Sequence, residues 1–241
     1  MRGFIDLHCH WIVSIDDGVR TAEESYALLS GLHEVGFDHV VATPHMRPGM
    51  FDNTRRELED AYRETRASLE GRPGLPRLSL SSEHFFDDVV FERFMRDDVL
   101  PYPGGKAALV EFDPRGFPTH LEHRFFDLMR RGIRPVIAHP ERYTPVWKSV
   151  QSLDKYLDVG AVLLLDVAAL SGKYGRSAQR ASEQLVREGY YYAACTDSHA
   201  PADVADVRRG IAALAELAGD DEVEFLFVEG PTHILEGRVE D

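Results

Sequence analysis

The chain has 241 residues, of which 44% are hydrophobic, and a formal net charge of −14 at pH 7. This length and composition predict one folded domain over residues 1–241 and argue against intrinsic disorder. The negative charge argues against nonspecific binding to nucleic acid or to an anionic membrane, because both need a basic face. The two cysteines argue against a disulfide framework, and no run approaches the about 18 apolar residues of a membrane span, so we expect a cytoplasmic protein without export or membrane insertion.

Short apolar runs alternate with segments of helical periodicity along the whole chain. The predicted strands comprise residues 3–7, 39–42, 78–82, 107–110, 135–138, 161–165 and 191–195. The predicted helices comprise residues 21–35, 54–69, 119–131, 152–159, 177–188 and 205–217. Alternating strands and helices imply a parallel sheet, either open or closed as a barrel.

Histidines and carboxylates recur just after these apolar runs. The candidate metal ligands are His8, His10, Asp17, His45, Glu83, Glu111, His139, Asp197 and His199, and Asp16 stands beside them. An open sheet concentrates its site at one crevice, whereas a barrel brings the C-terminal ends of all its strands around one mouth. Because nearly every predicted strand end supplies one of these side chains, the pattern favours a barrel of about seven strands with a metal site at its C-terminal rim.

The donor types indicate the chemistry of this site. A single His-x-His pair such as His8 and His10 is more often incidental than metal-binding, and a lone strand-end glutamate is usually solvated. Their recurrence at successive strand ends favours the ligand interpretation. Nitrogen and oxygen donors without thiolate suit Mn²⁺, Fe²⁺ or Zn²⁺. Two or three such ions about 3.5–4 Å apart would polarise a phosphoryl oxygen and activate a bridging water, so the pattern predicts phosphoester hydrolysis by a metal-bridging hydroxide.

Five motifs carry a resemblance to a known family. They are Asp-x-His-x-His at 6–10, Asp-Asp-Gly at 16–18, Thr-Pro-His at 43–45, His-Pro-Glu-Arg-Tyr at 139–143 and Asp-Ser-His at 197–199. With them the chain resembles the polymerase and histidinol phosphatase (PHP) superfamily, and within it the bacterial manganese-dependent protein tyrosine phosphatases encoded with capsule and exopolysaccharide genes. The resemblance implies a distorted (β/α)7 barrel holding three metals, usually manganese. It also implies phosphotyrosine hydrolysis, typically on the tail of a polysaccharide-export tyrosine kinase.

The resemblance assigns roles to individual residues. It implies a first ion held by His8, His10, Glu83 and Asp197, a second by Glu83, Glu111 and His139, and a third by Asp17, His45 and His199. Arg142 matches an arginine expected to bind the phosphate, and Arg47 lies in a stretch similar to the substrate-side loop, although a solvated loop arginine is an equal alternative. Asp6 is a candidate partner for a ligand histidine, or a strand-end turn residue.

Two departures from the family pattern leave alternatives open. The family usually has an arginine soon after the last Asp-x-His, whereas the next arginine here is Arg208, which either substitutes from a shifted helix or leaves one phosphate contact missing. A polar residue common on the sixth strand is replaced by Leu164.

The sequence excludes one other function, argues against a second and leaves two open. A cysteine-based phosphatase loop is excluded, because the sixth residue after Cys9 is Ile15 and after Cys195 is Pro201. The remaining rivals are a phosphatase for a small ester such as histidinol phosphate and a non-catalytic metal-binding regulator of a kinase. The acidic charge argues against a DNA exonuclease. Exposed helices could serve a homo-oligomer.

Overall fold

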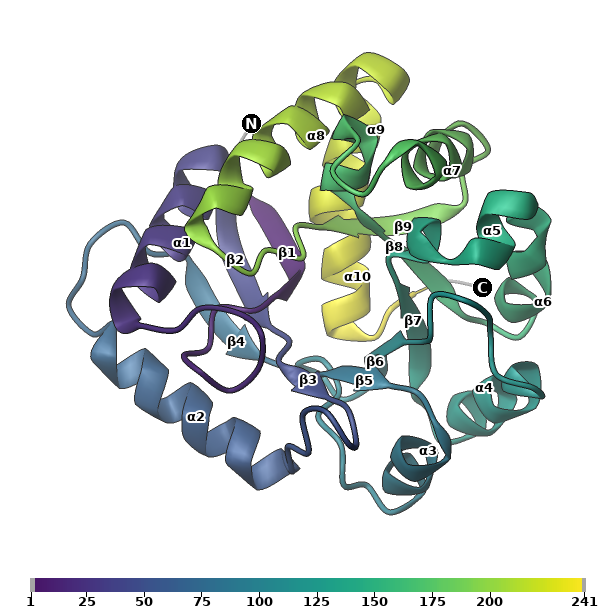
Figure 1. Cartoon of the computed structure of the whole chain (residues 1–241), viewed down its shortest axis with the longest axis horizontal. Coiled ribbons are helices and arrows are strands. Elements are labelled where there is room, and N and C mark those ends of the chain that lie inside the picture. The colour runs from purple at the N-terminus through teal and green to yellow at the C-terminus, as the bar shows by residue number, and fades with distance from the viewer. Residues whose placement is uncertain (1–2, 240–241) are drawn as a thin grey trace.

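The structure is a computed structural model that describes residues 3–239, and its strands form a ring with helices outside (Figure 1). The strands are β1 (Phe4–Cys9), β2 (Phe37–Ala42), β3 (His45–Met46), β4 (Arg77–Leu80), β5 (Glu83–Phe85), β6 (Ala107–Glu111), β7 (Arg134–Ala138), β8 (Val162–Asp166) and β9 (Tyr191–Cys195). They form two sheets, with orders β1-β2-β4 and β3-β5-β6-β7-β8-β9, and neighbouring strands in these sheets are parallel. The predicted parallel α/β class is therefore confirmed.

Two strand paths are interrupted by a pair of residues. Thr43-Pro44 separates β2 from β3, and Ser81-Ser82 separates β4 from β5. Hydrogen bonds carry the pairing across both breaks, from Ser81 N to Ala42 O at 2.8 Å and from Glu83 N to Pro44 O at 3.1 Å. The nine strand segments therefore follow seven paths around the ring, which correspond to the seven predicted strands.

The ring is not closed by continuous ladders. Between β1 and the segment after β9, one bridge joins Cys9 and Ser198, flanked by hydrogen bonds from Asp197 N to His8 O at 2.8 Å and from His10 N to Ser198 O at 2.9 Å. Within residues 3–239, β4 pairs only with β2 and has no ladder to β6. The predicted barrel is thus an incomplete ring in hydrogen-bonding terms.

Most of the helices lie outside the ring, whereas the last one lies within it (Figure 1). The helices are α1 (Ala22–Val35), α2 (Arg55–Ser68), α3 (Asp88–Met95), α4 (Leu121–Arg130), α5 (Thr144–Lys148), α6 (Asp154–Leu157), α7 (Arg176–Arg187), α8 (Val204–Ala218), α9 (Asp220–Glu224) and α10 (Gly230–Glu236). Thr21 caps α1 by accepting from Glu24 N, and Thr54 forms a capping box with Glu57 at the start of α2. The helix predicted over 152–159 is shorter than expected, because residues 150–153 form a 3₁₀ turn before α6. Among the described residues, none of the helices has the length and apolar character to cross a bilayer.

The inside of the ring is a separate apolar cluster. Leu7, Leu109, Val136 and Leu164 are fully buried in it, and Ile234 of α10 joins them. Figure 1 shows α10 in the middle of the ring. Gly230 allows this close approach, because a Cβ there would lie 1.9 Å from Tyr192 O at the start of β9. The last helix therefore fills the N-terminal end of the ring, while the opposite end remains for the site.

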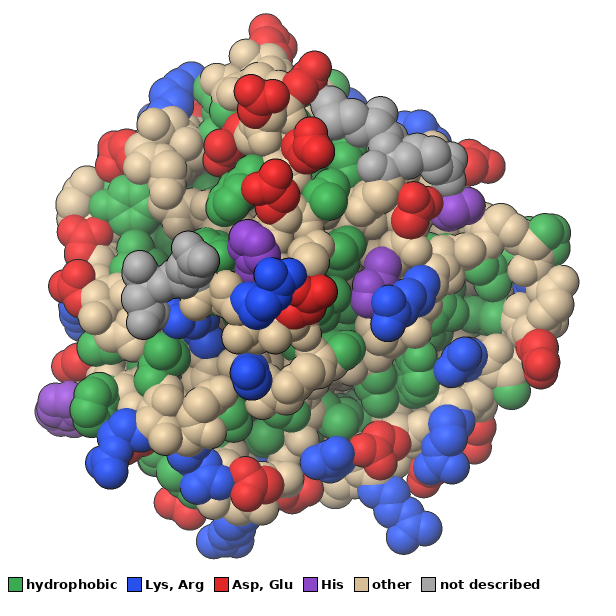
Figure 2. Space-filling view, turned by 180° about the vertical axis from the view of Figure 1, so that it is seen from behind, with side chains coloured by type: hydrophobic (Ala, Val, Ile, Leu, Met, Phe, Trp, Pro, Cys, Tyr) green, Lys and Arg blue, Asp and Glu red, His purple; other side chains and the backbone are tan. Residues whose placement is uncertain are grey.

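The surface charge is unevenly distributed. On the face seen in Figure 2, acidic side chains gather in the upper part and Lys and Arg side chains in the lower part. The net charge of −14 is thus an average over regions of different sign.

Candidate metal centre

All nine predicted ligands meet at the C-terminal ends of the parallel strands. His8 lies in β1, His10 just after it, and Asp197 and His199 just after β9. Their ligand atoms form four overlapping groups, each within 4.8 Å: His8, His10 and Asp197; His8, Glu83 and His139; His45, Glu83 and Glu111; and His10, Asp17, His45 and His199. The grouping differs in part from the three-ion division implied by the resemblance. The set expected for the second ion is split, because His139 groups with His8 and Glu83, whereas Glu111 groups with His45 and Glu83.

The distances between the donor atoms match those around a bound metal ion. His8 Nε2 lies 3.1 Å from Asp197 Oδ1, 3.2 Å from Glu83 Oε2 and 3.1 Å from His10 Nε2. Donor atoms bound to one ion at about 2.0–2.2 Å lie roughly 3–3.5 Å apart. Among the described residues, the buried atoms Glu111 Oε2 and Asp197 Oδ1 have no hydrogen-bond partner. The residues therefore fit bound cations.

Glu83 lies at the centre of the groups. Its Oε1 is 3.1 Å from His139 Nε2, and its Oε2 is 3.0 Å from His45 Nδ1. Burial raises the pKa of Glu83, but the charges of His8 and His45 outweigh it and hold the pKa well below the usual range. In contrast, burial and the neighbouring Glu83 charge raise the pKa of Glu111 to about 7. The position of Glu83 between two groups is that of a bridging carboxylate.

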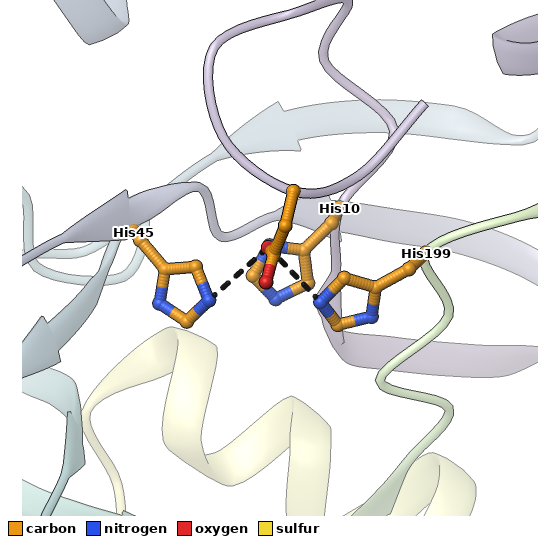
Figure 3. A group of neighbouring side chains, drawn as sticks. His10, His45 and His199 are labelled. Carbon is orange, nitrogen blue, oxygen red and sulfur yellow. Dashed lines mark ion pairs between the residues drawn. The ribbon is translucent and has the colours of Figure 1, made fainter. Parts of the chain in front are cut away.

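His10, His45 and His199 lie close together at the mouth of the site (Figure 3), and Asp17 completes this outermost group. Its Oδ1 lies 3.4 Å from both His45 Nε2 and His199 Nε2. The His199 ring stacks on His10 with centroids 4.0 Å apart. Hydrogen bonds with His199 and His45 lower the pKa of Asp17, although half of its side chain remains exposed. This group is therefore open to solvent, unlike the buried groups around His8.

Asp16 orients two of the candidate ligands. Its buried Oδ2 accepts from His10 Nδ1 at 2.8 Å and from His45 N at 3.1 Å, which leaves His10 Nε2 facing the site. Gly18 is needed in the same loop, because a Cβ there would lie 2.2 Å from His10 O. The sequence shows the acidic pair at 16–17, but it does not show that Asp16 orients ligands while Asp17 faces the site.

The role expected of Asp6 needs correction. Its carboxylate accepts from His8 N at 3.2 Å and from Thr196 N and Oγ1 at 3.0 and 2.6 Å, whereas Nδ1 of the His8 ring has no hydrogen-bond partner among residues 3–239. Burial raises the pKa of Asp6 to about 7 despite these hydrogen bonds. Asp6 therefore joins the end of β1 to the segment after β9 and supports the site through the backbone.

Two candidate ligands have left-handed backbones. His139 has φ 35° and Asp197 has φ 42°, a region that costs a non-glycine residue about 1–3 kcal/mol. His139 begins the 3₁₀ turn Pro140–Arg142, and Asp197 begins the turn after β9. Both residues turn sharply at a strand end, and both side chains point to the common centre.

Arg142 lies beside the buried groups. Its guanidinium pairs with Asp166 and with Asp197, at 2.5 Å from the latter, and its Cζ lies 3.8 Å over the Tyr174 ring. Burial lowers the pKa of Arg142, but the charges of Asp197 and Asp166 outweigh it and raise the pKa well above its usual range. Asp166 and Tyr174 were missed in the sequence. Asp166 ends β8, so the strand-end rule that found Glu111 could have found it.

The strand that contains Leu164 ends in a carboxylate two residues later. Leu164 is fully buried in the cluster inside the ring, and its carbonyl accepts from His139 N at 2.9 Å. Asp166 supplies the carboxylate on this strand. The buried Glu141 carboxylate holds the backbone of Asp166 in place, because it accepts from Asp166 N at 3.0 Å and from the Tyr191 hydroxyl at 2.9 Å.

The two other arginines differ. Arg47 lies at the site, with its Cζ 4.2 Å over the Phe85 ring and its Nη1 3.9 Å from Glu111 Oε2. These contacts favour the functional alternative for Arg47, although its side chain remains 27% exposed. Arg208 instead pairs with Glu34 of α1 at 3.7 Å, and both side chains are exposed. This contact favours the alternative in which one phosphate contact is missing.

The model of the capsular polysaccharide synthesis CpsB/CapC family matches residues 4–236. The chain belongs to the CpsB/CapC family. Relatives in this family include the tyrosine-protein phosphatase YwqE of Bacillus subtilis, 26% identical over 196 residues, covering 81% of this chain and 77% of YwqE. The tyrosine-protein phosphatase CpsB of Streptococcus pneumoniae is 23% identical over 237 residues, covering 96% of this chain and 98% of CpsB.

Solved structures share the fold of this CpsB/CapC chain. The chain superposes on a crystal structure from work on YwqE of B. subtilis and CpsB of S. pneumoniae, with a TM-score of 0.90 at 23% identity. Those two proteins are metal-dependent tyrosine phosphatases. The superposition covers 98% of this chain and 96% of the other. A lactonase from Listeria monocytogenes superposes with a TM-score of 0.55 at 13% identity, covering 97% and 94%. These likenesses establish the fold, and the family match confirms the capsule-associated family that the motifs indicated.

Proposed function

We propose that this chain is a metal-dependent protein tyrosine phosphatase. The observation that carries the proposal is the convergence of nine nitrogen and oxygen donors on one rim, with Arg142 beside them. The donor set lacks thiolate and suits Mn²⁺, with Fe²⁺ or Zn²⁺ as alternatives. The ligands would be His8, His10, Glu83 and Asp197 for one ion, Glu83, Glu111 and His139 for a second, and Asp17, His45 and His199 for a third.

Protein groups would bind and orient the substrate. When bound, the ions would supply Lewis acidity and an activated water for phosphoester hydrolysis. Arg142 would hold the phosphate through its planar fork, while Asp166 and Asp197 fix the guanidinium in place. Arg47, stacked on Phe85, would contact the same phosphate. Asp16 would keep His10 Nε2 facing the site.

Phosphotyrosine is the substrate favoured by the names of the relatives and by the exposure of the mouth. Asp17 and His199 have side chains that are 51% and 30% exposed, so the rim is open to a side chain presented by another protein. The protein substrate would be a tyrosine kinase of polysaccharide biosynthesis. Cys9 and Cys195 are both free and buried, in keeping with the cytoplasm that we propose as its compartment.

The test compares three substrates on one preparation. Metal-stripped protein is restored with Mn²⁺ and given a phosphotyrosine peptide, the matching phosphoserine peptide and histidinol phosphate. We expect metal-dependent hydrolysis with preference for phosphotyrosine. The Glu83→Gln variant should lose this activity, because Glu83 belongs to two of the groups.

Each other outcome has a distinct meaning. Preference for histidinol phosphate would replace the protein substrate with a small ester. Metal binding without turnover of any substrate would support the non-catalytic regulator. Equal turnover by Glu83→Gln would contradict the assigned centre.

A further inference from the structure

A second cavity adjoins the candidate metal centre. It has a volume of 410 Å³ and lies between the end of β5, the start of α3 and the loop after β6. Its lining is rich in apolar side chains: Phe85, Phe86, Val89, Phe112 and Phe117. Val89 is 50% exposed, a large value for an apolar side chain, so the cavity opens to solvent at that residue. We call this cavity the Phe85 pocket.

The carboxylates around the Phe85 pocket are already engaged by the protein. Asp87 caps α3 by accepting from Val90 N at 2.8 Å, and Asp88 pairs with Arg124. Asp113 pairs with Arg115, whose Nε and Nη2 lie 2.8 and 2.6 Å from its two oxygens. Since each carboxylate has a partner, the unsatisfied feature of the pocket is its apolar surface. An apolar ligand is thus favoured over a cationic one.

Arg47 lies between Phe85, which lines the pocket, and Glu111 of the metal centre. Its Cζ stacks on Phe85, while its Nη1 faces Glu111 Oε2 at 3.9 Å. The backbone also joins the two sites, because Phe86 N donates to Glu111 O at 2.8 Å and Phe112 directly follows Glu111. Residues that flank the phosphotyrosine would therefore reach the Phe85 pocket within a few positions, since an extended chain spans about 3.3–3.6 Å per residue.

We propose that the Phe85 pocket binds an aromatic or branched aliphatic side chain of the substrate polypeptide, one to three residues from the phosphotyrosine. This inference rests on the proposed function and adds a determinant of sequence preference to it. Catalysis would depend on the metal centre, and the pocket would select among phosphotyrosine sites. A small phosphate ester would not reach it.

The test uses peptides and a matched pair of variants. Phosphotyrosine peptides carry Phe, Ala or Lys at one position at a time, up to three residues on either side of the phosphotyrosine. Val89→Asp puts a charge at the mouth of the pocket, in the first turn of α3, where an acidic residue is compatible with the helix. Phe126→Asp, on α4, changes an apolar side chain that is 55% exposed and lies outside the pocket lining.

We expect the wild type to show kcat/KM about tenfold higher for Phe than for Ala at one flanking position, the scale typical of one apolar side chain in a pocket. The ratio should fall to about one in Val89→Asp and remain tenfold in Phe126→Asp. Hydrolysis of the Ala peptide by Val89→Asp would show that this variant is folded.

The other outcomes separate the inference from the proposed function. Metal-dependent hydrolysis with equal kcat/KM for Phe and Ala at every position would overturn the pocket and leave the phosphatase intact. Preference for Lys would overturn the apolar ligand. A preserved tenfold ratio in Val89→Asp would place the selectivity elsewhere, and absence of turnover on all peptides would overturn both proposals.

Discussion

Replacement of Asp16 by asparagine should weaken metal binding without removing any candidate ligand. Asp16 is 3% exposed and its carboxylate accepts three hydrogen bonds, from His10 Nδ1, from His45 N at 3.1 Å and from Gly18 N at 2.9 Å. An asparagine oxygen can still serve Gly18. Its amide group would then face His45 N and His10 Nδ1, so that a donor meets a donor.

The size of the effect follows from these contacts. A buried donor without an acceptor costs about 1–3 kcal/mol. Loss of a carboxylate that orients a ligand histidine typically lowers metal affinity by about 10- to 100-fold. We therefore expect Asp16→Asn to raise the Kd for Mn²⁺ by about 10- to 100-fold, with partial recovery of phosphatase activity at high Mn²⁺.

The assay is competition with a fluorescent chelator, repeated with activity measured across Mn²⁺ concentrations. Asp127→Asn, an exposed carboxylate on α4, is the matched control and should resemble the wild type. Circular dichroism checks that both variants are folded. A folded Asp16→Asn with Mn²⁺ affinity within twofold of the wild type would refute the idea that Asp16 orients the centre.

Two further predictions concern phosphate binding and acid stability. Arg142→Lys should lower kcat/KM for a phosphotyrosine peptide by about 10- to 100-fold at saturating Mn²⁺, because lysine keeps the charge but loses the fork; unchanged kcat/KM would remove Arg142 from the phosphate site. Burial and Arg77 lower the pKa of His39 to about 4, while its Nε2 bonds Ser79 Oγ at 2.7 Å. The unfolded chain therefore binds more protons below about pH 6.5, and metal-free protein should lose about 1–2 kcal/mol of stability between pH 7.5 and 5 through this residue. Urea unfolding should show a smaller loss in His39→Gln, and an equal loss would mean that other groups control the acid response.

The strand paths and the ligand set were predictable from the sequence because both obey short-range rules. Apolar runs of strand length mark a parallel sheet, and the residue after each run must lie at the same rim. This placed His8, Glu111 and His139 without knowledge of the order of strands in space. The breaks at Thr43-Pro44 and Ser81-Ser82 were not predictable, because the pairing continues across them through single hydrogen bonds.

The elements that were not predicted have sequences typical of another structure, or depend on contacts between distant segments. The run Val89-Val90-Phe91 in α3 consists of residues common in strands, and its helix begins because Asp87 caps it. The last helices contain Gly230-Pro231, a pair that usually marks a turn. Asp166 follows the strand-end rule, but its pairing with Arg142 joins the end of β8 to the 3₁₀ turn after β7, which no local pattern encodes.

The position of α10 has a consequence for biosynthesis. Ile234 occupies the same interior as Leu7, and the rim joins His8 to Asp197, so contacts needed from the first strand are made by residues near the end of the described chain. During translation, β1 and β2 would gain interior partners such as Tyr102 and Leu109 early, but they would lack Ile234 until nearly all of the described residues have been synthesised. Contacts of such long sequence separation form slowly, and their unpaired strand edges are exposed meanwhile. The interior should therefore be completed only when residue 234 is available, and the metal ligands should be assembled only when the segment with Asp197 and His199 has joined β1.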